Sequence, residues 1–330
     1  MNDPIELPAA LADSEIARLL TGDKVVERLT GLAALFHPKA AAASHQVELR
    51  SCLAHADESV RRLAAIVFAK VGAGQTEALG RAVENGPSAQ VRIAAATGLA
   101  ALGATAAQSS GILCNAIMND AAVRVHAAIA LAKIGAQALP DIASAIAQPD
   151  APPELFDAIA LMGSAAASTT PILEHALPAR PPESKVACLC ALETLAGEAK
   201  RTEELVETIR TIAEGSTRAA ALERFSRLRQ PATGQAMLEF LEDEAPGVRA
   251  VAILACARVG TPASVAMPSL VKCLADESDD VKRAALVAIG SLGVASKETI
   301  AALAALCLTG AKGIRDAAIA ISARIGGDKP

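Results

Sequence analysis

The chain has 330 residues, of which 52% are hydrophobic and 20% are charged, and its formal net charge is −5. This charge argues against a general DNA-binding surface, and the absence of Trp and Tyr removes the rings on which single-stranded nucleic acids usually stack. Residues 1–20 lack the basic start of a secretory signal, and no run of about 18 strongly apolar residues predicts a transmembrane helix.

The N-terminal part, 1–40, is predicted to be a cap that contains a degenerate first repeat near 24–36. From 41 to 330 we expect one continuous repeat array, with eroded repeats at about 150–235. Its phrase reads DESVRRLAAIVFAKVG from Asp57, SAQVRIAAATGLAALG from Ser88 and DAAVRVHAAIALAKIG from Asp120. A phrase that returns about every 32 residues is the signature of a repeat architecture.

The phrase is aligned here on the apolar residue before Arg or Lys, which is called position 1. The six strong copies begin at Val60, Val91, Val123, Val248, Val281 and Ile314. Each ends in glycine at the same offset, at Gly72, Gly103, Gly135, Gly260, Gly293 and Gly326. A glycine at this point suits the left-handed residue that commonly follows a helix.

Each phrase is predicted to be a helix. Positions 1, 5, 8 and 12 are apolar in the first strong copy, at Val60, Ala64, Val67 and Val71, and this spacing places them on one helix face. Alanine at position 5 recurs and lets neighbouring helices approach closely. Asp57, Ser88 and Asp120, three residues before position 1, are expected to cap the helix N-termini.

A second amphipathic helix precedes each phrase, for example over 109–120, 138–148 and 266–277. No strand-like alternation flanked by hairpin turns is present. The repeating unit is therefore helix A, a turn, helix B and a turn. Neither helix can bury its apolar face alone, so we expect an all-α solenoid in which neighbouring units share a core.

The phrase D-x-x-V-R-x-x-A-A-x-x-L-x-x-[IV]-G resembles the HEAT repeat, in the short bacterial variant named after phycobilisome lyases. The resemblance covers nearly the whole chain and is clearest over 45–140 and 240–326. The Trp and Tyr of tetratricopeptide repeats and the T-P-L-H pattern of ankyrin repeats are missing. The resemblance implies a right-handed α–α superhelix of about ten helix pairs.

Position 2 is basic in every strong copy. The resemblance implies an inter-repeat ladder, in which this residue bonds to an Asp in the A–B turn of a neighbouring unit. The residues assigned to the ladder are Asp57, Arg61, Arg92, Asp120, Arg124, Arg249, Lys282 and Arg315. The alternative is a basic stripe that grips phosphate or an acidic partner.

Positions 3, 7 and 10 point away from the buried face but are unusually apolar, and position 11 tends to be basic. Packing against neighbouring repeats could account for this, or the strip could be a partner groove. The candidate partner-binding face comprises Arg62, Ile66, Lys70, Ile93, Thr97, Val125, Ile129, Lys133, Leu254, Arg258, Arg283 and Val287.

Residues with catalytic or metal-binding chemistry form no motif. None of the five histidines precedes a Glu, so the iron-binding His-Glu pairs of the HEAT-repeat deoxyhypusine hydroxylase are absent. The sequence has no H-E-x-x-H, C-x-x-C or Gly-rich phosphate loop. Seven cysteines without a signal indicate reduced thiols, and Cys188 and Cys190 make only a weak C-x-C pair. We therefore predict no catalytic residue, no metal and no cofactor.

Proline-rich stretches at 147–156 and 176–185 bracket weak copies. Ordinary A–B turns with proline near a helix start explain them, and a change of curvature or a protruding binding loop is the alternative.

These observations predict a non-catalytic, cytoplasmic scaffold that binds another protein on the concave face formed by the B helices. One alternative is an accessory or chromophore-lyase-like enzyme subunit, although the lack of Tyr and Trp argues against a chromophore pocket. A second alternative is a HEAT-like DNA-binding protein or glycosylase, and charge and aromatic content both disagree with it.

Overall fold

The structure is a computed structural model that describes residues 11–36, 42–71, 76–294 and 296–326. Within these ranges all regular structure is helical and no strand occurs, so the predicted all-α class is confirmed. The chain divides into two compact units, Met1–Ala176 and Leu177–Pro330, which are called unit 1 and unit 2.

The helices of unit 1 alternate between the predicted A and B types. They are α1 (Asp13–Thr21), α2 (Val25–Ala34), α3 (Gln46–Leu53), α4 (Glu58–Val71), α5 (Thr76–Asn85), α6 (Ala89–Leu102), α7 (Ser110–Asn119), α8 (Arg124–Ile134), α9 (Leu139–Ile146), α10 (Pro153–Met162) and α11 (Thr170–Ala176).

Unit 2 continues the alternation. Its helices are α12 (Pro182–Ala196), α13 (Thr202–Arg210), α14 (Gly215–Ser226), α15 (Pro231–Met237), α16 (Pro246–Val259), α17 (Ala263–Cys273), α18 (Asp279–Leu292), α19 (Lys297–Thr309) and α20 (Lys312–Gly326).

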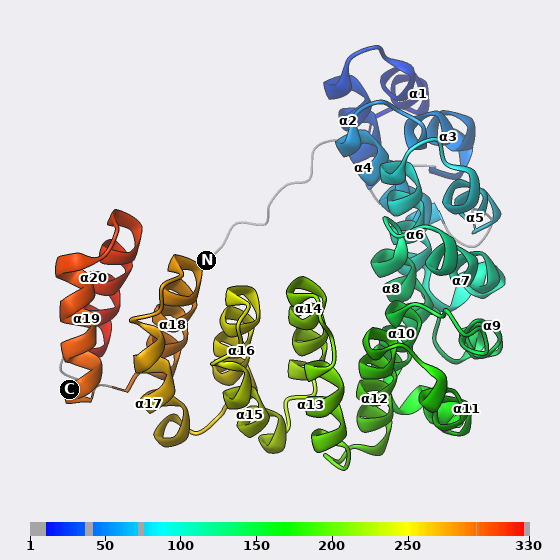
Figure 1. The fold of residues 1–330 in the computed structure, drawn as a ribbon. Coiled ribbons are helices and arrows are strands. Elements are labelled where there is room, and N and C mark those ends of the chain that lie inside the picture. The colour runs from blue at the N-terminus through cyan, green and yellow to red at the C-terminus, as the bar shows by residue number, and fades with distance from the viewer. Residues whose placement is uncertain (1–10, 37–41, 72–75, 295, 327–330) are drawn as a thin grey trace, which may run out of the picture. The chain divides into compact units, whose positions relative to one another are not determined.

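Within each unit the helices form two layers. In unit 1, α4, α6, α8 and α10 pack side by side, and α5, α7 and α9 run along their other side (Figure 1). In unit 2, α14, α16, α18 and α20 form the corresponding row. This is the arrangement of an α-solenoid, as predicted. Its handedness and the number of helix pairs stay predictions.

In the strong copies of the phrase, the buried face of the helix is made mainly of small and branched apolar residues. Val60, Ala64 and Val67 are fully buried in α4. The position-5 alanine is fully buried in every strong copy, at Ala64, Ala95, Ala127, Ala252, Ala285 and Ala318. A larger side chain at such a site would overpack the contact between neighbouring helices, at about 1–3 kcal/mol.

Glycine ends several of these helices in a conformation that L-residues avoid. The backbone φ angle is positive at Gly103, Gly135, Gly260 and Gly293 of the strong copies, and at Gly163 and Gly197 of the eroded ones. Gly72 lies outside the described residues, and Gly326 is the last residue of α20. One eroded copy begins with Thr217 at position 1, and its closing position, twelve residues later, is held by Arg229 with φ 51°.

Two of the three predicted N-caps are present. Ser88 Oγ accepts the Val91 N–H, and Asp57 Oδ1 accepts the N–H groups of Ser59 and Val60. The prediction for Asp120 was wrong. Residues 121–123 form a turn, so Val123 is the N-cap of α8 and Asp120 lies at the end of α7.

The proline-rich stretches lie at helix starts. Pro152 and Pro181 are the N-cap residues of α10 and α12, and Pro153 and Pro182 are the first helical residues. A proline is well placed there, because the first helical N–H has no partner within the helix.

Two continuous helical runs, Arg124–Ile146 and Pro153–Ala179, are long and apolar enough to cross a membrane by length and composition. Each run contains a sharp break, because Gly135 has φ 78° and ψ −146° and Gly163 has φ 58° and ψ −137°. Those angles lie outside the helical region. Each run is therefore a series of shorter helices of the array and not one straight rod.

Candidate partner-binding face

The predicted face comprises positions 3 and 7 of the even-numbered helices, which are called the outer columns, together with the basic residues Lys70, Lys133 and Arg258 at position 11. In unit 1 they hold exposed aliphatic side chains, with Ile66 42%, Val125 57% and Ile129 40% exposed. These residues are exposed because the opposite side of each helix, such as Ala127 and Ala130 in α8, fills the core.

The middle helix of this row is more covered. Ile93 of α6 is half-buried, because α6 packs between α4 and α8. Thr97 is exposed, and its hydroxyl donates to the Ile93 carbonyl oxygen at 2.9 Å. The outer columns of unit 1 therefore expose aliphatic side chains on α4 and α8. On α6 they hold the half-buried Ile93 and the polar Thr97.

Two basic residues accompany the aliphatic side chains of unit 1. Arg62 is exposed at position 3 of α4, and Lys133 is exposed in the last turn of α8. A cation near a helix C-terminus is favoured by the helix dipole. The side chain of Lys70, in α4, lies outside the described part of the chain.

Unit 2 repeats the aliphatic pattern, but its basic residues Arg258 and Arg283 form ion pairs. Leu254 is 40% and Val287 56% exposed on α16 and α18. Arg283 pairs with Asp280 one turn earlier. Arg258, the position-11 residue of α16, reaches back to α14, where Nη1 and Nη2 lie 2.7 and 2.8 Å from the Glu223 carboxylate oxygens.

The pair between Arg258 and Glu223 changes the proton affinity of both groups. The hydrogen bond from Arg258 lowers the pKa of Glu223 although burial opposes this, and the hydrogen bond to Glu223 raises the pKa of Arg258. Arg258 is thus held as an ion-paired link between two helices and is a poorer candidate for partner contact than Lys133.

Three position-2 arginines, Arg92, Arg218 and Arg249, join neighbouring repeats. Arg92 Nε lies 2.6 Å from Asp120 Oδ2, and Nη1 of the same residue donates to the Gly86 carbonyl oxygen at 2.9 Å. Asp120 Oδ1 accepts the N–H of Ala122. One carboxylate therefore closes its own turn and anchors the arginine of the preceding repeat.

The same arrangement occurs twice in unit 2, with both carboxylate oxygens engaged. Arg218 Nε and Nη2 lie 2.9 and 2.8 Å from Asp243, and Arg249 Nε and Nη2 lie 2.8 Å from Asp276. Burial opposes ionisation of Asp276, but hydrogen bonds from Arg249 and the Ser278 N–H outweigh it, so the pKa of Asp276 is lowered. Bidentate pairs of this kind fix orientation as well as supplying energy.

Sequence reasoning missed Arg218, Asp243 and Asp276. Arg218 lies in an eroded copy, and the two acids stand five residues before position 1 and not three. The signal was nevertheless present, because Asp243 and Asp276 have the same offset from Val248 and Val281.

The other residues assigned to the ladder have different contacts. Arg61 Nη1 donates to the carbonyl oxygens of His55 and Ala56, and Arg124 Nε donates to that of Ile117. Lys282 pairs with Asp279 of its own helix. Asp57 caps α4, as described above, and Arg315 is exposed.

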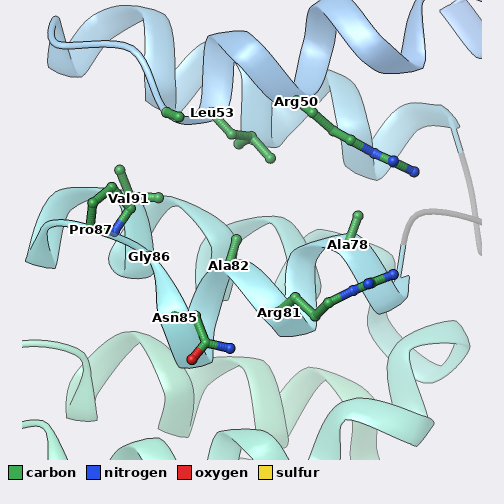
Figure 2. Close-up of a pocket in the computed structure, with 10 residues that line it drawn as sticks. Arg50, Leu53, Ala78, Arg81, Ala82, Asn85, Gly86, Pro87 and Val91 are labelled. Carbon is green, nitrogen blue, oxygen red and sulfur yellow. The ribbon is translucent and has the colours of Figure 1, made fainter.

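A pocket outside the predicted face lies between α3 and α5 and has a volume of about 350 Å³. Leu53, Ala78 and Ala82 line it, and Arg50 and Arg81 point toward the same end (Figure 2). Arg81 Nη2 is 2.8 Å from Glu77 Oε1. The sequence did not single out either arginine.

The described residues hold no group of three or more His, Cys, Asp or Glu side chains that could bind a metal. Cys188 and Cys190 are both buried in α12. Burial, with a smaller effect of Asp141, raises the pKa of the Cys114 thiol to about 12, and burial raises that of Cys256 to about 12. Such thiols remain protonated at neutral pH and are poor nucleophiles.

The region that contains the two bidentate pairs resembles a known family. Residues 202–285, from α13 into α18, match the family model described as HEAT repeats. These residues are HEAT repeats. The predicted resemblance is thereby confirmed, and the Arg218–Asp243 and Arg249–Asp276 pairs both lie inside the HEAT segment. The assignment to the short phycobilisome-lyase type stays a prediction.

The sequence matches no curated protein. Similar solved structures include the complex of CpcE and CpcF of phycocyanin lyase from Nostoc sp. PCC7120, at 19% identity and TM-score 0.42, covering 78% of this chain and 96% of that one. Importin beta is 15% identical with TM-score 0.47, covering 94% of this chain and 50% of that one. Human deoxyhypusine hydroxylase is 16% identical with TM-score 0.35, covering 78% and 98%. At these values the likenesses carry no argument about activity.

Proposed function

We propose that this chain is a non-catalytic scaffold that binds another protein across the outer columns of its even-numbered helices. The observation that carries the proposal is the recurrence of exposed aliphatic side chains at equivalent repeat positions, namely Ile66, Val125, Ile129, Leu254 and Val287. Covering such side chains removes apolar area from water, which contributes about 25 cal/mol per Å². A recurring exposed apolar patch on a folded surface marks an interaction site.

The outer columns of unit 1 are the better candidate for the interface. The cations Arg62 and Lys133 of this unit are exposed beside the aliphatic side chains, whereas Arg258 and Arg283 of unit 2 are ion-paired. A partner with an apolar ridge flanked by carboxylates would complement this surface. We also propose a cytoplasmic location, because all seven cysteines are free and six of them are buried.

The test is site-specific photo-crosslinking in the native cell. A photoreactive residue is placed at Ile129 in one variant and at Val47 in another. Val47 is the matched control, because it is an exposed aliphatic residue, 77% accessible, on α3 in the other layer. The proposal expects one dominant protein adduct from position 129 and a much weaker one from position 47.

A second variant, Ile129→Asp, separates binding from crosslinking chemistry. It should abolish co-purification of the same adduct partner, while Val47→Asp should not. Equal adducts from both positions, or a partner that survives Ile129→Asp, would show that the outer columns are not the interface. A visible absorbance change with a linear tetrapyrrole, or a salt-sensitive shift of duplex DNA, would instead favour the enzymatic or DNA-binding alternatives.

A further inference from the structure

The pocket between α3 and α5 lies where a glycine of the neighbouring helix pair is replaced by an arginine. Leu49 of α3 and Leu79 of α5 are both fully buried and hold equivalent positions in successive A helices. The residue after Leu79 is Gly80, where a Cβ atom would lie only 3.1 Å from Ile112 Cδ1 of α7. The residue after Leu49 is Arg50. Helices α5 and α7 therefore pack closely at the glycine, whereas α3 and α5 leave a pocket between them.

The two ends of this pocket differ in charge. Arg50 and Arg81 point toward one end, and Gly86 and Pro87, in the turn after α5, line the other (Figure 2). Within the described part of the chain, no carboxylate pairs with the exposed Arg50. The pair of Arg81 with Glu77 uses one guanidinium nitrogen, and its side chains are 66% and 76% exposed. Solvent screens such a pair, so Arg81 is held weakly and can meet a second acceptor.

The walls between the two ends are apolar and short. They are formed by Leu53 of α3, Ala78 and Ala82 of α5, and Val91 of α6. From Ala78 to Asn85, the last residue of α5, the helix extends about 10 Å at about 1.5 Å per residue. The volume of about 350 Å³ is also near the lower limit for ligand pockets, which is roughly 300 Å³. The pocket therefore has room for a short apolar group and not for a helix.

Such a pocket fits a group that is aliphatic along its length and anionic at one end. An arginine fork meets a carboxylate in a bidentate geometry. In an extended peptide, neighbouring side chains point to opposite sides. An internal Asp or Glu would therefore direct its carboxylate away from a pocket that its aliphatic neighbour fills. At the end of a chain, the α-carboxylate and the aliphatic side chain belong to one residue, so both reach the pocket together.

We propose that the pocket between α3 and α5 binds the aliphatic carboxyl-terminal residue of another protein. The α-carboxylate lies between Arg50 and Arg81, and the aliphatic side chain packs against Leu53 and Ala82. The pocket is in the layer of helices opposite the outer columns, and Val47, the crosslinking control, does not line it. The proposal therefore does not depend on the proposed function, and each is tested by its own experiment.

Fluorescence anisotropy of the full chain with a fluorescein-labelled peptide tests this site. The probe ends in Ala-Val-Leu with a free carboxylate, and the matched ligand is the same peptide with a carboxyl-terminal amide. We expect the acid to bind at least about tenfold more tightly than the amide, because hydrogen bonds to a charged group contribute more than those to a neutral group. The difference should shrink as salt is added.

Three substitutions at exposed residues locate the site. Arg50→Gln should weaken binding of the acid peptide about tenfold and leave binding of the amide unchanged. Glu77→Gln should strengthen binding of the acid peptide, because it releases Arg81 from its ion pair. Arg62→Gln is the matched control, since it also removes an exposed cation of unit 1 but lies on α4, outside the pocket. It should change neither affinity.

A fourth variant tests the apolar part of the pocket. Ala78→Leu should weaken binding of both peptides, because it fills the pocket without changing the charge, and far-UV circular dichroism shows whether the variant is folded. Absence of binding, equal affinity for acid and amide, or an Arg50→Gln variant that loses no more affinity than Arg62→Gln would overturn the proposal. Octanoate that displaces the peptide at a similar concentration would assign the pocket to free aliphatic carboxylates and would overturn the chain terminus as its occupant.

Discussion

Arg258 on α16 donates two parallel hydrogen bonds to the carboxylate of Glu223 on α14. The Nη2 atom of Arg258 also lies 2.8 Å from Ser226 Oγ. Both charged side chains are about one-third exposed, at 34% and 37%. Solvent screens a pair in this position, so its contribution is modest although its geometry is bidentate.

A double-mutant cycle measures that contribution. Arg258→Ala and Glu223→Ala, singly and together, should give a coupling of about 0.5–1 kcal/mol in the free energy of unfolding, falling as salt is added. A coupling that does not respond to salt would mean that the two side chains interact through packing and not through charge.

The inter-repeat pair of Arg249 and Asp276 should be worth much more. Its side chains are only 10% and 12% exposed, so Arg249→Met leaves a carboxylate largely removed from water and without its partner. We expect a loss of about 3 kcal/mol in urea-induced unfolding. Arg283→Met, which removes an exposed pair on α18, should change the free energy by less than about 0.5 kcal/mol. Similar losses in the two variants would contradict the assigned role.

Arg229 is expected to destabilise the native chain. Its φ of 51° occurs at a repeat position that glycine holds elsewhere, and its side chain is exposed. Arg229→Gly should raise the free energy of unfolding, measured by thermal denaturation, by about 1 kcal/mol, because a residue with a Cβ atom is disfavoured in the left-handed region.

Gly260 supplies the reverse experiment. Its φ is 79°, and a Cβ atom there would meet nothing within 4 Å, so the cost of Gly260→Ala comes from the backbone alone. The free energy of unfolding of this variant should be about 1 kcal/mol lower than that of the wild type. If Arg229→Gly is neutral while Gly260→Ala is destabilising, the positive φ at Arg229 carries no strain.

Glu193 should make stability depend on pH in an unusual direction. Its side chain is buried in α12 and accepts the backbone N–H of Lys200 before α13. Burial raises the pKa of this carboxyl, and the hydrogen bonds from the backbone oppose the shift. The folded state therefore binds a proton more readily than the unfolded state, so this group's contribution to stability is greatest at low pH and declines as pH rises through the folded pKa.

Urea unfolding of the wild type and Glu193→Gln at pH 7 and at about pH 5 tests this sign. The wild type should gain stability relative to the variant on acidification. Glu203→Gln, at an exposed site on α13, is the control and should show no such gain. A wild type that loses stability relative to Glu193→Gln at the lower pH would show that the hydrogen bonds, and not burial, dominate.

The helical fold was predictable because its signals are local and repeated. The 1-5-8-12 spacing, the position-5 alanine and the closing glycine each recur at fixed offsets, so six imperfect copies reinforce one another. The candidate site was less predictable, because it depends on side chains meeting across repeats. The sequence predicted Arg258 as an exposed cation, because its partner Glu223 lies 35 residues away in another repeat. The role of Asp243 was not predicted, because the turn before α16 has a different length from the turn before α4.

Each of the Arg–Asp pairs described above joins one repeat to the next one only, as in Arg218 to Asp243 and Arg249 to Asp276. Under tension applied along the array, such contacts act in series, so every junction bears the same load and the weakest one opens first. A junction closed by a bidentate pair resists this load more than one where Lys282 turns back to its own helix. A partner that pulls on the chain would therefore open the junctions that lack such a pair, as at Arg61, Arg124 and Lys282, before the paired ones, and the chain would lengthen in steps.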